Sequence, residues 1–269
     1  MTIHLNTDLP SILKPYQPSI AATIKPFIRI QTVPDQALKL WQSKFGGLPY
    51  LPKEFAYPTD AAGNPLRLLA QINCVEIPSG TDFPEQGILQ FYIAADDDLY
   101  GLNFDDQFEQ NQFRVVFFEQ VIKDDSQLVT DFTFLTHSDD GLTPITGEYA
   151  LYFELTEAPI SLGDANFSSA FGRQAYDDAD DADDFYDAYD ELFSGAGHKL
   201  GGYPFFTQED PREYRKELRP YVLLFQMDTD NTEGVDIMWG DSGVANFFIL
   251  PQDLQNKDFS RVMYNWDCY

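Results

Sequence analysis

The chain has 269 residues and carries 17 Lys and Arg against 44 Asp and Glu, which gives a formal net charge of −27. Its 43% apolar and 15% aromatic fractions exclude an intrinsically disordered protein, because disordered chains lack enough apolar surface to form a core. A chain this acidic is not expected to bind nucleic acid or an anionic membrane, since both attract clustered Lys and Arg.

The two cysteines, Cys74 and Cys268, lie far apart in the sequence and have no histidine nearby at metal-ligand spacing. We therefore expect free thiols in a reducing compartment, with no metal and no cofactor. The first ten residues lack the basic and apolar regions of a secretory signal, and no uninterrupted apolar run is long enough to span a bilayer. These features predict a cytoplasmic protein.

Short strands separated by Gly and Pro dominate the chain. Strands are expected at 24–33, 68–73, 87–93, 113–121, 128–135 and 147–156, and again at the repeated segments described below. Helices are expected at 9–23, 35–44 and 164–171, and at about 185–194. The fold class predicted is mainly β, α+β at the margin, with a few short helices.

An acidic run precedes the last of these helices. Residues 177–191 contain nine Asp and Glu. We expect 177–184 to be an exposed loop, because closely spaced carboxylates repel one another and are costly to bury. Phe185, Tyr189 and Leu192 or Phe193 share one helical face and should point inward. The glycines at 195 and 197 should end the helix.

The sequence also contains an internal repeat. The segment from Ser43 to Tyr50 matches 198–205, and 68–73 matches 223–228, both at an offset of 155 residues. The segment 87–93 matches 243–249 at an offset of 156, and 114–117 matches 261–264 at 147. We therefore predict one compact domain, 1–269, with a first repeat at 43–121, a second repeat at 198–266 and a connector at 122–197. The predicted architecture is an internally duplicated, roll-like fold whose halves are related by a pseudo-two-fold axis.

Several blocks resemble the YwqG-like family of bacterial proteins of unknown function. They are the segments 44–49, 71–73, 198–204, 210–212 and 238–244, which read KFGGLP, QIN, HKLGGYP, DPR and MWGDSGV. The resemblance extends from about residue 38 to 267. It implies a mainly β, duplicated roll, and it implies no reaction. The acidic run is unusual for that family.

The Lys-x-Gly-Gly-x-Pro motif occurs in both repeats. Adjacent glycines permit positive φ and a close approach of the backbone, so the motif is either a tight turn whose lysine pairs with a carboxylate or a cradle for an anion. Gln71 and Gln226 are matched polar residues within apolar strands. They either bond to the scaffold across the halves or contact a ligand at their junction. The candidate binding residues are Lys44, Gly46, Gly47, Gln71, His198, Lys199, Gly201, Gly202, Gln226, Trp239, Asp241 and Ser242.

No catalytic residue is assigned. The Gly-Asp-Ser-Gly segment 240–243 is not expected to be a serine-protease nucleophile, because no histidine lies in a base motif. His198 is the only candidate for a general base, and Glu209, Asp210 and Arg212 follow it closely, although 210–212 is more simply a turn with an ion pair. The acidic segment 228–239 departs from a calcium-binding loop at its sixth and twelfth positions.

Two functions are consistent with these features. The first is a non-enzymatic binding protein for a basic protein partner, which could include a basic toxin domain that it neutralises, because the negative charge would steer such a partner. The second is a small-ligand binder or enzyme that uses a groove between the repeats. A deep pocket holding His198, Lys44 and Lys199 would favour the second function.

Overall fold

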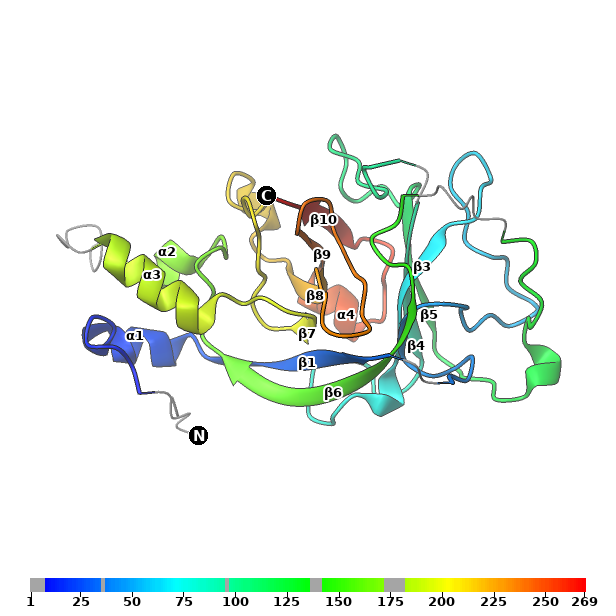
Figure 1. Ribbon diagram of the computed structural model, residues 1–269, viewed down its shortest axis with the longest axis horizontal. Helices are drawn as coiled ribbons and strands as arrows, with labels where there is room; N and C mark the ends of the chain where they lie inside the picture. The colour runs from blue at the N-terminus through cyan, green and yellow to red at the C-terminus, as the bar shows by residue number, and fades with distance from the viewer. Residues whose placement is uncertain (1–7, 35–36, 95–96, 136–141, 172–181) are drawn as a thin grey trace.

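The computed structural model describes residues 8–34, 37–94, 97–135, 142–171 and 182–269. Ten strands form one antiparallel sheet in the order β10-β9-β8-β7-β1-β6-β2-β3-β4-β5, which is strongly curved (Figure 1). The strands are β1 (Lys25–Val33), β2 (Lys44–Gly46), β3 (Arg67–Asn73), β4 (Ile88–Ile93), β5 (Phe113–Phe118), β6 (Glu148–Ala158), β7 (Lys199–Gly201), β8 (Val222–Asp228), β9 (Val244–Ile249) and β10 (Met263–Asp267). The helices are α1 (Gln17–Ala22), α2 (Phe167–Phe171), α3 (Ala182–Phe193) and α4 (Pro251–Gln255), with 3₁₀ turns η1 (Lys14–Tyr16), η2 (Cys74–Glu76), η3 (Asp125–Gln127) and η4 (Lys216–Leu218). The predicted mainly β class with a few short helices is confirmed.

The strand order is symmetric about the central pair of β1 and β6, the two long strands along the lower edge of Figure 1. Strands β2–β5 follow β6 on one side, and β7–β10 follow β1 on the other. In the sequence, however, β1 precedes β2 and β6 precedes β7. Each half therefore contributes its leading strand to the sheet of the other half, and β6 lies in the segment that the sequence assigned to the connector.

The strand ladders of the two halves match residue by residue. Lys44 lies opposite Gln71, and Lys199 lies opposite Gln226. The register shifts once between residues 68 and 70 and once between 223 and 225, at the same offset of 155. This register reproduces the offset of the first two sequence blocks.

The last block was aligned wrongly by two residues. Arg114 lies opposite Tyr92, and the matching position opposite Phe248 is occupied by Met263 rather than by Arg261. A slip of two residues in a strand keeps every side chain on the same face. The apolar pattern alone could not detect it.

The inner faces of the two halves pack against each other in one aromatic core. The ring centroids of Phe91 and Phe225 are 4.7 Å apart, and those of Phe91 and Phe247 are 4.9 Å apart. Phe45 also contacts Phe225, at 5.8 Å. Residues on the outer faces of β3, β4, β8 and β9 are buried as well, because loops cover them. Polar side chains on these strands must therefore find partners inside the protein.

Two predicted elements are wrong. The segment 128–135 contains only an isolated bridge, between Pro52 and Leu128, because it is a covering loop rather than a member of the sheet. The helix predicted at 35–44 is absent from its described part, 37–44. There the carbonyl oxygens of Leu40 and Gln42 accept hydrogen bonds from the Gln71 side chain, which hold the segment against the sheet in a non-helical conformation. The helix predicted at 9–23 is reduced to η1 and α1.

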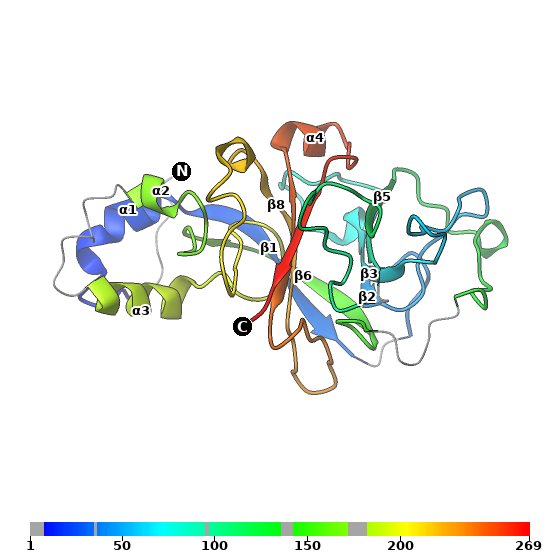
Figure 2. The ribbon, with the colours of Figure 1, turned by 90° about the horizontal axis from the view of Figure 1, so that it is seen from above.

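Helices α1, α2 and α3 gather at one end of the molecule, beyond the ends of β1 and β6 (Figure 2). They enclose a separate apolar cluster in which Phe185 and Tyr189 are buried, as predicted. Phe193 packs against this cluster, and Leu192 is 37% exposed. Helix α3 begins at Ala182, so 182–184 are helical rather than part of a loop, although Asp183 and Asp184 are exposed as expected. Residues 177–181 lie outside the described part of the chain.

Candidate anion site beside Lys199

The predicted glutamines hold a loop against the outer face of the sheet in the first half. The side-chain oxygen of Gln71 accepts hydrogen bonds from the backbone N–H of Tyr50, at 2.7 Å, and from Gln90 Nε2, at 2.7 Å. Its nitrogen donates to the carbonyl oxygens of Leu40 and Gln42, both at 2.7 Å. Gln71 has no exposed surface and its polar atoms have protein partners, so it has a structural role.

The second half repeats this arrangement. Gln226 accepts from the backbone N–H of Phe205, at 2.8 Å, and donates to the carbonyl oxygens of Gly195 and Gly197, at 3.0 and 2.8 Å. Asn246 Nδ2 donates to the Phe205 carbonyl, as Gln90 Nε2 donates to that of Tyr50. The two glutamines therefore bind matching backbone groups and lie in separate halves rather than at one ligand site.

Both Lys-x-Gly-Gly-x-Pro motifs form tight turns. Gly46, Gly47, Gly201 and Gly202 all have positive φ, between 63° and 75°. The turn folds the chain back, so that each lysine donates to the carbonyl oxygen four residues later. The Lys44 Nζ–Leu48 O and Lys199 Nζ–Tyr203 O distances are both 3.2 Å. The motif is thus a turn closed by its own lysine.

The second glycine of each motif makes room for a side chain from the leading strand. A Cβ atom on Gly47 would lie 2.2 Å from a carboxylate oxygen of Glu148, and one on Gly202 would lie 2.7 Å from Cβ of Phe27. Glu148 lies opposite Gly46, and Phe27 lies opposite Gly201. Glu148 in the first half and Phe27 in the second therefore occupy matching positions.

This exchange gives the two buried lysines different surroundings. Lys44 is 1% exposed, and its Nζ lies 2.8 Å from Glu148 Oε1 in an ion pair. Lys199 is 3% exposed and donates to the carbonyl oxygens of Gly195 and Tyr203, and its Nζ lies 5.3 Å above the Phe27 ring. Among the described residues, no carboxylate lies within ion-pair distance of Lys199.

The pKa of Lys199 reflects this difference. Burial lowers the pKa to about 7, and the nearby Asp228 carboxylate offsets this only in part. Arg29 lowers it further by repulsion between like charges. At neutral pH, Lys199 is therefore divided between its charged and its neutral forms.

A cavity of about 620 Å³ opens beside Lys199, where the sheet meets the end of α3. Its wall includes Arg29 and Phe27 of β1, the segment 192–199, and Thr229, Asp230 and Thr232 after β8. Arg29 lies directly opposite Lys199 in the ladder, so both side chains emerge on the same face. Two cations therefore face each other at this cavity, and such pairs are unfavourable unless an anion lies near them.

Within the described part of the chain, Arg29 forms an ion pair with one carboxylate. Its Nη1 lies 3.2 Å from Glu154 Oε2, and the side chains of both residues are about half exposed. An exposed pair of this kind contributes little to stability, so Arg29 can turn toward a ligand at small cost. In the first half the position matching Arg29 is Ala150, which lies opposite Lys44 and carries no charge.

His198 lies at the same cavity but is held by the protein. Its Nδ1 accepts a hydrogen bond from the backbone N–H of Asp228, at 3.0 Å, and its Nε2 lies 3.3 Å from Asp230 Oδ2. The hydrogen bond from His198 is the largest of the effects that hold the pKa of Asp230 well below its usual range. Thr32 Oγ1 donates to the same carboxylate, at 2.8 Å. His198 and Asp230 thus form an ordered polar wall of the cavity.

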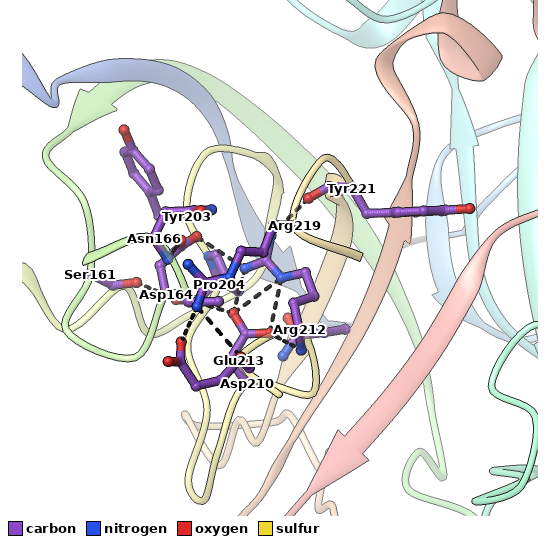
Figure 3. A network of polar contacts seen from close by, with 12 residues as sticks. Ser161, Asp164, Asn166, Tyr203, Pro204, Asp210, Arg212, Glu213, Arg219 and Tyr221 are labelled. Atoms are coloured by element: carbon purple, nitrogen blue, oxygen red, sulfur yellow. Dashed lines mark hydrogen bonds and ion pairs between the residues drawn. The ribbon is translucent and has the colours of Figure 1, made fainter. Parts of the chain in front are cut away.

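Arg212 is buried in a network of its own (Figure 3). Its guanidinium lies between two carboxylates, 2.5 Å from Asp210 and 3.0 Å from Asp164, and it donates to the carbonyl of Tyr221 at 2.8 Å. Asp210 also accepts from the backbone N–H of Ala165. These contacts tie the segment 210–212 to the loop before α2, which accounts for the Asp-Pro-Arg turn.

The remaining predicted residues lie elsewhere. Trp239 is fully buried against Tyr100 and Trp266. Asp241 and Ser242 are exposed in the turn before β9, where Ser242 has a φ of 84°. Lys44 does not line the Lys199 cavity. Of the predicted set, only His198 and Lys199 line this cavity.

The described residues contain no group of three His, Cys, Asp or Glu side chains that could hold a metal ion. Cys74 and Cys268 are free thiols, and burial raises the pKa of Cys74 to about 12. No helix among the described residues is both long enough and apolar enough to cross a membrane.

Sequence reasoning missed Arg29 and Phe27, which belong to the site through strand pairing. The sequence shows the apolar residues Ile28 and Ile30 alternating with Arg29, as in a strand with one buried face. This pattern could not show that β1 pairs with β7. The pairing places residues 170 positions apart in direct contact.

The comparison with protein families identifies a family for this chain and names no activity. Residues 43–268 match the family described as a domain of unknown function (DUF1963). The chain belongs to this family. No curated protein matches it significantly.

Proposed function

We propose that the protein binds a small molecule with an anionic group, in the cavity between Arg29 and Lys199. The observation that carries this proposal is the pair of cations placed opposite each other on β1 and β7, at a cavity, in a chain with a net charge of −27. A bound carboxylate or phosphate would relieve the repulsion between the two cations and would favour the charged form of Lys199.

The shape of the cavity supports a small ligand rather than a macromolecule. Lys199 is nearly buried, so only a group that enters the cavity reaches it. The wall combines apolar side chains, such as Phe27, Leu192 and Phe193, with the ordered polar pair of His198 and Asp230. Pockets of this mixed composition and size are typical of small-molecule sites.

The test uses lactate and inorganic phosphate as probes, followed by NMR chemical shifts of the backbone amides. We expect shifts at Arg29, at 195–199 and at 229–232. Arg29→Gln and Lys199→Met should weaken binding about tenfold or more, because each removes one of the two positive charges that would contact the anion. Lys44→Met is the matched control and should leave affinity unchanged. Shifts outside the cavity, or equal losses in the two lysine variants, would overturn the proposal.

A second variant does not depend on the buried lysine. Ala196 is exposed and lines the cavity, so Ala196→Trp should fill the opening without disturbing the core. A folded Ala196→Trp protein that binds lactate as well as the wild type does would place the ligand elsewhere.

Binding of a basic protein partner is the second candidate function. Its support is the polar face of α3, where Asp183, Asp184, Asp187, Asp190 and Glu191 are exposed. The test is association with a basic protein recovered from the native host at low salt. Changing Asp183, Asp184 and Asp187 to Asn should slow association and flatten its salt dependence. Unchanged association kinetics would show that α3 does not take part in binding this partner.

Two narrower predictions accompany these proposals. The two free thiols support the prediction that the protein functions in a reducing compartment such as the cytoplasm. The resemblance to the YwqG-like family of bacteria rests on the motif blocks alone and stays a prediction.

A further inference from the structure

We infer that Lys199 forms an imine with the carbonyl group of a small 2-oxo acid, whose carboxylate lies against Arg29. This inference rests on the proposed function and adds a covalent step to it. The supporting observations are the cavity, the cross-strand position of Arg29, and the contrast between Lys199 and Lys44.

The surroundings of the Lys199 amine suit a nucleophile. When neutral, the amine has two N–H bonds and one lone pair. The carbonyl oxygens of Gly195 and Tyr203 accept the two N–H bonds, so the lone pair is not needed for either contact. The pKa of about 7 provides a substantial neutral fraction at physiological pH. Lys44, in contrast, forms an ion pair with the Glu148 carboxylate, at 2.8 Å.

The position of Arg29 selects the ligand class. Residues directly opposite each other on antiparallel strands have Cβ atoms about 5 Å apart. A carboxylate adjacent to a carbonyl is short enough to contact Arg29 while the carbonyl carbon approaches Lys199 Nζ. The planar guanidinium also suits bidentate contact with a carboxylate. A 2-oxo acid combines both groups in one small molecule.

The reaction is balanced without an oxidant or a second substrate. The Nζ lone pair attacks the carbonyl carbon and forms a C–N bond, while the oxygen takes up a proton. The hydroxyl group of this adduct then leaves as water, after a second protonation, and the C=N bond forms. Overall, the amine loses two hydrogens and the carbonyl loses its oxygen, so one water is released.

The test is reductive trapping with pyruvate and sodium cyanoborohydride, followed by peptide mapping. We expect one carboxyethyl group on Lys199, at a rate about a hundredfold above that of ordinary lysines, because most ordinary lysines are protonated at neutral pH. Lys44 should remain unmodified. Lys199→Arg should abolish this labelling, whereas Lys44→Arg should leave it unchanged.

A second pair of probes tests the role of Arg29 without altering the lysine. Arg29→Gln should slow trapping of pyruvate about tenfold more than it slows trapping of acetaldehyde, because acetaldehyde has no carboxylate. Equal slowing of both probes would refute the assigned position of the carboxylate.

The outcomes separate the two proposals. Amide shifts at the cavity with both lactate and pyruvate, but no trapping at Lys199, would overturn the imine and leave anion binding intact. No shifts and no trapping would overturn both. Labelling of Lys44 at the same rate as Lys199 would show that the chemistry is not a property of this cavity.

Discussion

The two buried lysines of this protein occupy matching positions in a duplicated sheet and differ in the neighbours that the leading strands supply. Lys44 lies against the Glu148 carboxylate, and Lys199 lies against the Phe27 ring. Both turns are closed by a bond from the lysine to the carbonyl oxygen four residues later, and a glutamine lies opposite each lysine. The Lys-x-Gly-Gly-x-Pro motif therefore has a structural role in both halves. The residue from the leading strand, Glu148 or Phe27, determines whether the lysine is paired with a carboxylate or can contact a ligand.

The largest loss of stability should come from replacing the buried glutamines that both halves contain. Gln71→Leu and Gln226→Leu each leave several buried backbone groups without partners, so each should lower the free energy of unfolding by about 3 kcal/mol. Urea denaturation followed by circular dichroism measures this loss. The exposed Gln252→Leu is the control and should be near neutral. If only one of the two substitutions lowers the free energy of unfolding, the glutamines do not have equivalent structural roles in the two halves.

The pH dependence of stability should distinguish the two lysines. The pKa of Lys199 is lowered to about 7 in the folded state, so the unfolded chain binds more protons above that pH. Stability linked to Lys199 therefore rises with pH, by about 2 kcal/mol between pH 7 and 9. Lys199→Met should remove this rise, and Lys44→Met should retain it. Burial also raises the pKa of Asp228, the carboxyl group that partly offsets the shift of Lys199.

Replacing Phe27 by glutamate, the residue at the matching position of the first half, should make the surroundings of Lys199 resemble those of Lys44. Phe27→Glu places a carboxylate beside Lys199, and Gly202 leaves space for it, as Gly47 does for Glu148. The pKa of Lys199 should rise and lactate affinity should fall about tenfold, because an internal anion then competes with the ligand. Calorimetric titration measures the affinity. Phe27→Gln alters the shape similarly without the charge, so an equal loss in both variants would contradict the electrostatic explanation.

The smallest effect should come from the acidic face of α3, which lies outside both lysine sites. Changing Asp183, Asp184 and Asp187 to Asn should alter the free energy of unfolding by no more than about 0.5 kcal/mol, since all three are exposed. Lactate affinity should not change. Thermal denaturation and the same titration provide the two measurements, and a marked loss of stability would show that these carboxylates support the helix.

Much of the fold could be predicted from local patterns. The repeat predicted the matching register of Lys44 and Lys199, and the glycine pairs predicted the two turns. The helix predicted at 35–44 is wrong, and the Gln71 side chain instead binds the carbonyl groups of Leu40 and Gln42, which is a contact between distant segments.

The candidate site was predicted only in part, for the same reason. His198 and Lys199 lie within one repeated motif and could be found from it. Arg29 and Phe27 join them through pairing of β1 with β7, and nothing in the local sequence specifies that pairing.

The exchange of leading strands also has a consequence for how the chain folds during synthesis. Strand β1 is made before both of its partners, β6 and β7, which follow more than a hundred residues later in the chain. The first half therefore cannot complete its sheet while it is alone outside the ribosome, because its own β2 needs β6. Such non-local pairing favours slow folding, on a scale of milliseconds to seconds, and leaves strand edges unpaired in the meantime. The nascent chain should thus depend on chaperones until the segment that carries Lys199 emerges, and the cavity forms only in the last stage of folding.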